Sequence, residues 1–161
     1  MTWLSFQNRL RIAVESADAF SYLHYAVFIP ILHRDIKSAN ILLDDYYTTK
    51  IVDFGASRLR PFDQADMSSL IIPGYLDPEA IQMGLSDKSD VYSFGVVLAE
   101  LLKAIDLTLP NKEKSLAPYF IASMKENRLF QTLHHRVLKE GSLDQLNAMG
   151  ELVVRCLNIK R

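Results

Sequence analysis

The sequence is poor in several features, and each shortage excludes a class of protein. A single cysteine, Cys156, among 161 residues excludes an intramolecular disulfide and a cysteine-rich metal cluster. Eighteen basic against nineteen acidic residues give a net charge of −1, so no excess charge supports binding to nucleic acid. The longest apolar stretches, 25–32 and 91–102, fall short of the roughly 20 residues of a membrane span, so we expect no direct membrane insertion. Six glycines are present, and none are spaced to cradle phosphates.

The composition is otherwise that of an ordinary globular protein, with 49% hydrophobic and 23% charged residues. The spacing of the hydrophobic residues predicts a mainly helical fold. The period of the first helix places Leu10 and Phe20 on one face, with Arg9 and Ser16 elsewhere. Asp90 lies on the apolar side of a later helix, which makes it a candidate buried acid. The predicted helices cover 5–25, about 87–103, about 115–127 and about 142–157, and a predicted β-hairpin joins 41–43 to 50–52.

Two motifs carry the chemistry. Residues 33–40 read His-Arg-Asp-Ile-Lys-Ser-Ala-Asn, which matches the H-R-D-x-x-x-x-N catalytic loop of protein kinases, and a D-F-G triplet follows at 53–55. Phosphoryl transfer needs metal-bridged phosphates, neutralised charge and an oriented acceptor hydroxyl. Asp35 suits the orientation of the hydroxyl and Lys37 the neutralisation of charge. The oxygen atoms of Asn40 and Asp53 suit a hard cation such as Mg²⁺.

The whole chain resembles the C-terminal lobe of plant receptor-like serine/threonine kinases, and most closely the wall-associated receptor kinases. The resemblance rests on both motifs, on 8–43, on Asp-Pro-Glu at 77–79 and on 89–102. It implies a partial kinase domain over 1–161, with an activation segment at 53–79 and a central helix at about 87–103. It also implies ATP and Mg²⁺ as cofactors and transfer of phosphate to Ser or Thr hydroxyls of a protein substrate in cell-surface receptor signalling.

The resemblance assigns catalytic roles to Asp35, Lys37 and Asn40, and Mg²⁺ binding to Asn40 and Asp53. Leu42 is similar to the residue that packs under the adenine ring. A parent receptor would hold this domain at the cytosolic face of the plasma membrane. The chain as given has no signal peptide, so we expect it to be cytoplasmic.

The resemblance also assigns structural or regulatory roles. Arg34 is expected to pair with a phosphate on the activation segment. Ser68 and Ser69 stand at the phosphorylated positions, although two solvated loop serines explain them equally well. Glu79 is expected to be a buried acid, and Asp90 to accept hydrogen bonds from the backbone of the catalytic loop. The full set is His33, Arg34, Phe54, Gly55, Ser68, Ser69, Glu79 and Asp90.

Three departures from the family bear on the enzymatic activity, and because the N-terminal lobe is missing we expect the isolated chain to be inactive. Only 32 residues precede His33, with no G-x-G-x-x-G loop and no V-A-I-K lysine, so we expect the N-terminal lobe to be absent. Residues 71–75 lack the threonine that bonds the catalytic Asp and Lys, and the arginine that pairs with Glu79 lies beyond Arg161. The alternative function is an inactive kinase fragment or pseudokinase acting as a scaffold or decoy, or an incomplete gene model. Its partner is the missing lobe or another kinase chain.

Overall fold

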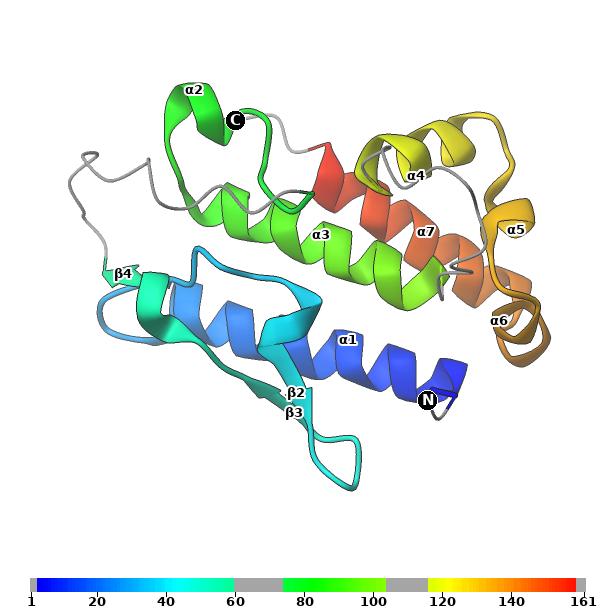
Figure 1. Ribbon diagram of the computed structural model, residues 1–161, viewed down its shortest axis with the longest axis horizontal. Helices are drawn as coiled ribbons and strands as arrows, with labels where there is room; N and C mark the ends of the chain where they lie inside the picture. Colours follow the sequence, from blue (N-terminus) through cyan, green and yellow to red (C-terminus); the bar gives the residue numbers. More distant parts are fainter. Residues whose placement is uncertain (1–2, 60–73, 104–115, 159–161) are drawn as a thin grey trace.

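A computed structural model describes residues 3–59, 74–103 and 116–158 (Figure 1). Its centre is α3 (Asp87–Lys103), which lies between α1 (Phe6–Ser21) and α7 (Leu143–Leu157). The mainly helical architecture with a small hairpin is confirmed. The other helices are α2 (Ala80–Met83), α4 (Leu116–Lys125), α5 (Leu129–Thr132) and α6 (His135–Glu140), and the strands are β1 (Ile31–Leu32), β2 (Ile41–Leu43), β3 (Thr49–Ile51) and β4 (Arg58–Leu59).

Local sequence explains where the two longest outer helices begin. The Ser5 hydroxyl accepts the N–H of Asn8 and so caps α1. Ser142 and Gln145 form a reciprocal capping box at the start of α7. The predicted helix over 5–25 is present: it is α-helical to Ser21 and continues as a π-helical turn, Tyr22–Ala26.

The buried face of α1 differs from the predicted one. It consists of Phe6, Arg9, Ile12, Ser16 and Phe20, whereas Leu10 is only half-buried. The expectation that Arg9 and Ser16 lie away from the core is wrong. Arg9 is tolerated in the core because its guanidinium donates to the carbonyl oxygens of two segments, at the start of α1 and the end of α3.

The predicted hairpin is present as the antiparallel pair β2–β3, in which Ile41 lies opposite Ile51. A second antiparallel pair, β1–β4, was not predicted, because strands of two residues carry no readable alternation. In the part of the chain that the structure describes, no helix combines the length and apolar character needed to cross a membrane.

Candidate active site

Asp90, in the first turn of α3, holds the backbone of the catalytic loop through hydrogen bonds. Asp90 Oδ2 accepts the backbone N–H of His33 at 2.8 Å, and Oδ1 accepts that of Arg34 at 2.9 Å. His24 Nε2 donates to Oδ2 at 2.9 Å, from the π-helical turn. Asp90 is 3% exposed, so these bonds form away from water. They hold Arg34 in the left-handed conformation (φ 69°), which a residue other than glycine adopts only at a cost.

His33 is fully buried and its two ring nitrogens have different partners. Nε2 donates to the carbonyl oxygen of Val52 at 3.1 Å, while Nδ1 accepts the N–H of Asp35 at 3.3 Å. These partners select the neutral Nε2–H tautomer. The ring also packs against the Phe54 ring at a centroid distance of 4.9 Å and contacts Phe20 edge-on. His33 therefore links the catalytic loop to both Val52 and the D-F-G segment.

Asp35, Lys37 and Asn40 are brought together in one polar cluster. Asp35 Oδ2 accepts hydrogen bonds from Lys37 Nζ at 2.9 Å and from Asn40 Nδ2 at 3.0 Å. Asn40 Nδ2 also donates to the main-chain oxygen of Asp35 at 2.8 Å. The second carboxylate oxygen, Asp35 Oδ1, is buried and has no hydrogen-bond partner among the described residues. A buried carboxylate oxygen without a donor is suited to accept one from a bound hydroxyl group.

Asn40 and Asp53 lie at neighbouring strand ends, because Val52 N–H donates to the Asn40 carbonyl oxygen at 3.0 Å. Asp53 is exposed, has φ 64°, and its carboxylate makes no hydrogen bond to the described residues. Carboxylate and amide oxygens fit Mg²⁺, which is commonly bound by one or two protein carboxylates together with phosphates. No cluster of three or more His, Cys, Asp or Glu side chains occurs in the described ranges, so a cation here would depend on ligand oxygens.

A second polar cluster, which the sequence did not reveal, flanks the catalytic loop. Tyr75 Oη donates to Glu100 Oε1 at 2.5 Å and lies 3.1 Å from Ser38 Oγ. Burial, and then the bond to Glu100, raises the pKa of Tyr75 to about 12. Burial also raises the pKa of Glu100, whose Oε2 has no partner among the described residues. Tyr75 and Glu100 are 25 residues apart, and neither helical nor strand periodicity relates residues at that separation. Periodicity therefore could not predict this pair.

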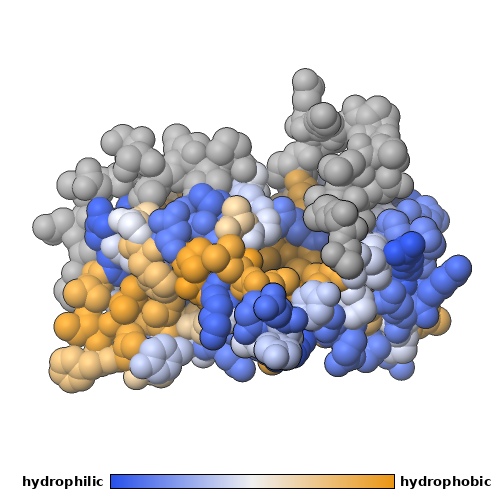
Figure 2. Space-filling view, turned by 60° about the horizontal axis from the view of Figure 1, so that its bottom comes forward, coloured by the Kyte–Doolittle hydropathy of each residue, from blue (hydrophilic) through white to orange (hydrophobic). Residues whose placement is uncertain are grey.

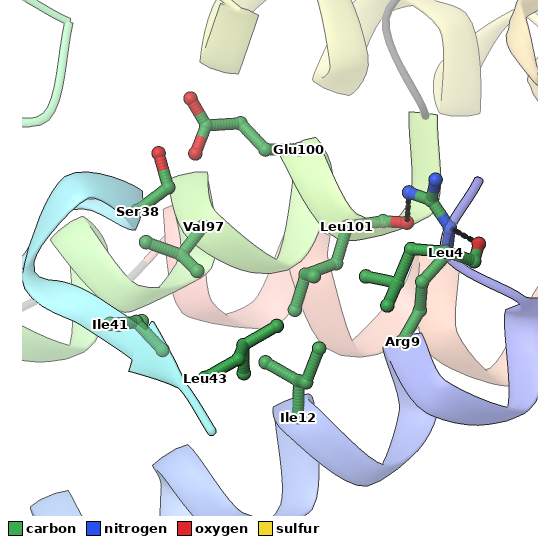
Figure 3. Close-up of a pocket in the computed structure, with 9 residues that line it drawn as sticks. All are labelled: Leu4, Arg9, Ile12, Ser38, Ile41, Leu43, Val97, Glu100 and Leu101. Atoms are coloured by element: carbon green, nitrogen blue, oxygen red, sulfur yellow. Dashed lines mark hydrogen bonds between the residues drawn. The ribbon is translucent and has the colours of Figure 1, made fainter. Parts of the chain in front are cut away.

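Beneath this cluster lies a cavity of about 280 Å³ between α1, α3 and β2 (Figure 3). Apolar side chains form most of its wall, and Ser38 and Glu100 lie side by side at one edge. At the opposite end, Arg9 donates to the carbonyl oxygens of Leu4 and Leu101, at 2.8 and 2.9 Å. Burial lowers the pKa of Arg9. The apolar lining residues are Leu4, Ile12, Ile41, Leu43, Val97 and Leu101.

Other predicted site residues lie outside these clusters. Leu42 and Phe54 are 51% and 45% exposed, and Gly55 follows Phe54 in an exposed turn. Ser68 and Ser69 lie outside the described residues. The expectation that Glu79 is a buried acid is wrong, because Glu79 immediately precedes α2 and is exposed to solvent.

Comparison with known proteins agrees with these motifs. A family model described as protein kinase domain matches residues 3–160. The chain is 47% identical over 162 residues to wall-associated receptor kinase 5 of Arabidopsis thaliana, covering 97% of this chain and 22% of that protein. It is 44% identical to putative wall-associated receptor kinase-like 16 of the same plant, covering 98% of this chain and 38% of that protein. The chain thus spans between about a fifth and two fifths of the length of these relatives, and it belongs to the protein kinase domain family.

Proposed function

We propose that this chain forms the catalytic C-terminal lobe of a serine/threonine protein kinase that transfers the γ-phosphate of ATP to hydroxyl groups of a protein substrate. The observation that carries the proposal is the state of Asp35. One carboxylate oxygen is held by Lys37 and Asn40, and the other is buried without a partner among the described residues. The free oxygen would accept the proton of an acceptor hydroxyl, and Lys37 would neutralise charge on the transferred group.

Mg²⁺ and ATP are the cofactors that kinases of this family use. Asn40 and Asp53 would hold the cation through oxygen atoms, and the metal would supply charge neutralisation at the phosphates. The exposed Leu42 would contact the adenine ring. Asp90 and His33 would act indirectly, because they hold the backbone of the catalytic loop rather than a substrate. The similarity to receptor kinases supports a place for this domain at the cytosolic face of the plasma membrane, in receptor signalling.

The test is phosphate transfer from radiolabelled ATP with Mg²⁺, by this chain joined to the N-terminal lobe of a wall-associated receptor kinase, to three peptides that differ only in carrying Ser, Thr or Tyr. We expect labelling of the Ser and Thr peptides and not of the Tyr peptide. Asp35→Asn should lower the rate about 10²–10⁴-fold, the usual worth of a general base. The matched control is Asp45→Asn in an exposed turn, which should leave the rate unchanged. Equal rates for Asp35→Asn and the unaltered chain would overturn the assignment.

The second candidate is a non-catalytic docking module. In Figure 2, apolar side chains gather on the left of the face, toward the end of the molecule that carries β4, and continue to its centre, whereas most of the right side is hydrophilic. Phe28 is fully exposed, and Leu42, Phe54 and Leu59 are each about half exposed. Apolar surface of this kind marks interaction sites, here for an N-terminal lobe or another kinase chain. Absence of both phosphate transfer and an Mg²⁺-ATP-induced rise in melting temperature would favour this candidate.

A further inference from the structure

Two side chains of α1 hold the β2–β3 hairpin from outside the catalytic cluster. Arg11 donates from Nη1 to the Tyr46 carbonyl oxygen at 3.1 Å and from Nη2 to Thr48 Oγ1 at 3.4 Å. Glu15 Oε2 accepts the N–H of Thr49 at 2.7 Å, where β3 begins. Arg11 Nε donates to Glu15 Oε1 at 2.7 Å, so the two side chains act as one i, i+4 unit.

The hairpin turn that this unit grips is itself closed. Asp44 Oδ1 accepts the N–H groups of Tyr46 and Thr48, at 2.9 and 2.8 Å. An isolated two-stranded hairpin is marginally stable in water, so its orientation depends on what it packs against. The backbone N–H of Thr49 and then the Arg11 guanidinium lower the pKa of Glu15, which is expected where the donors favour the ionised carboxylate.

The strand held by Glu15 leads directly to Asp53. β3 ends at Ile51, which pairs with Ile41 immediately after Asn40. The next residue, Val52, donates its N–H to the Asn40 carbonyl oxygen at 3.0 Å, and Asp53 follows. A shift of β3 relative to β2 would therefore lengthen this bond and change the separation of Asn40 and Asp53.

We propose that Arg11 and Glu15 are positioning residues that set the distance between Asn40 and Asp53 by fixing the hairpin to α1. The inference rests on the proposed function, in which Asn40 and Asp53 hold Mg²⁺. Neither Arg11 nor Glu15 contacts the site, and both act through the hairpin backbone. Loss of an outer support of metal ligands usually weakens metal affinity by about 10–100-fold, and the distance of this unit from the ligands predicts the low end, about tenfold.

The test compares the unaltered chain with Glu15→Ala, Glu15→Gln and a control, Glu126→Ala. The control removes an exposed Arg–Glu pair of the same type, Arg128 with Glu126, from the α4–α5 connection. Alanine is the best helix former, so Glu15→Ala leaves α1 intact. Hydrogen exchange by NMR measures protection of the Val52 N–H, and paramagnetic broadening by Mn²⁺ alone measures cation affinity.

We expect Glu15→Ala to speed Val52 exchange and to weaken Mn²⁺ binding, each about tenfold, with no change in the control. Glu15→Gln should restore most of both, because its amide oxygen still accepts the Thr49 N–H. Unchanged Val52 exchange in Glu15→Ala overturns the positioning role, whatever the cation result. If Val52 exchange is tenfold faster in Glu15→Ala but even the unaltered chain does not bind Mn²⁺, the link from Glu15 to the hairpin end is supported. The Mg²⁺ site of the proposed function is then overturned.

Discussion

Replacing Asp90 by alanine removes the acceptor of three hydrogen bonds at once. The donors are the backbone N–H groups of His33 and Arg34 and the Nε2–H of His24. A buried donor left without an acceptor costs about 1–3 kcal/mol, so three give about 3–9 kcal/mol. Partial relaxation and entry of water favour the lower part, and we expect a loss of about 3–5 kcal/mol, the usual result of breaking a buried charged pair. That is a large share of the 5–15 kcal/mol that stabilises a typical domain.

The assay is urea unfolding followed by circular dichroism, with the free energy of unfolding obtained by linear extrapolation. Asp45→Ala, in an exposed turn, is the control and should change stability by no more than about 0.5 kcal/mol. If Asp90→Ala does not fold, Asp90→Asn with its oxygen at the Oδ2 position keeps the hydrogen bonds from His33 and His24, loses that from Arg34 and should lose less stability than the alanine variant. A loss below about 1 kcal/mol for Asp90→Ala would refute the view that this carboxylate holds the catalytic loop.

Two further predictions concern packing and pH. A Cβ on Gly95 would lie 2.7 Å from Cys156 Cβ, so in Gly95→Ala an overpacking cost of about 1–3 kcal/mol outweighs the gain of about 1 kcal/mol in helix propensity and lowers the melting temperature. Gly150→Ala meets flexible side-chain ends instead and should lower it less. The Phe6 backbone N–H and then the Trp3 indole N–H donate hydrogen bonds to the Glu140 carboxylate and lower its pKa. Emission of Trp3, the single tryptophan, should change as the pH falls through that lowered pKa, since a carboxylate with a depressed pKa contributes its stabilisation only while ionised. Glu140→Gln should remove that change.

Elements with a strong period and a fixed motif could be predicted from the sequence. The helix expected over about 87–103 corresponds to α3, and the hairpin to β2–β3. Asp35, Lys37 and Asn40 share one loop of eight residues, and the match of that loop to a kinase motif predicted that they belong to one site. The buried face of α1 was predicted wrongly, because hydrophobic periodicity treats Arg9 as polar. Periodicity does not show that the carbonyl oxygens of Leu4 and Leu101 accept hydrogen bonds from the Arg9 guanidinium.

The resemblance predicted that Asp90 accepts hydrogen bonds from the backbone of the catalytic loop, but two side-chain pairs that support the site escaped prediction for a related reason. His24 and Asp90 are 66 residues apart, and Tyr75 and Glu100 are 25 apart. Each pair joins elements whose relative position is decided by packing of the whole lobe, and neither pair belongs to a local period. An acid on an apolar helix face, such as Asp90, does signal that a buried donor exists. It does not identify which side chain supplies that donor.

The left-handed backbone at Arg34 shows why such long-range supports are needed. A residue other than glycine in this region costs about 1–3 kcal/mol. Hydrogen bonds to a charged acceptor contribute about 1.5–3 kcal/mol each, so the two that the His33 and Arg34 N–H groups donate to Asp90 exceed the strain. The loop conformation is therefore held by α3 before any ligand arrives. The hydrogen bonds of Asp90 with His33 and Arg34 also orient Asp35, the next residue, because the Asp35 N–H donates to the ring of His33.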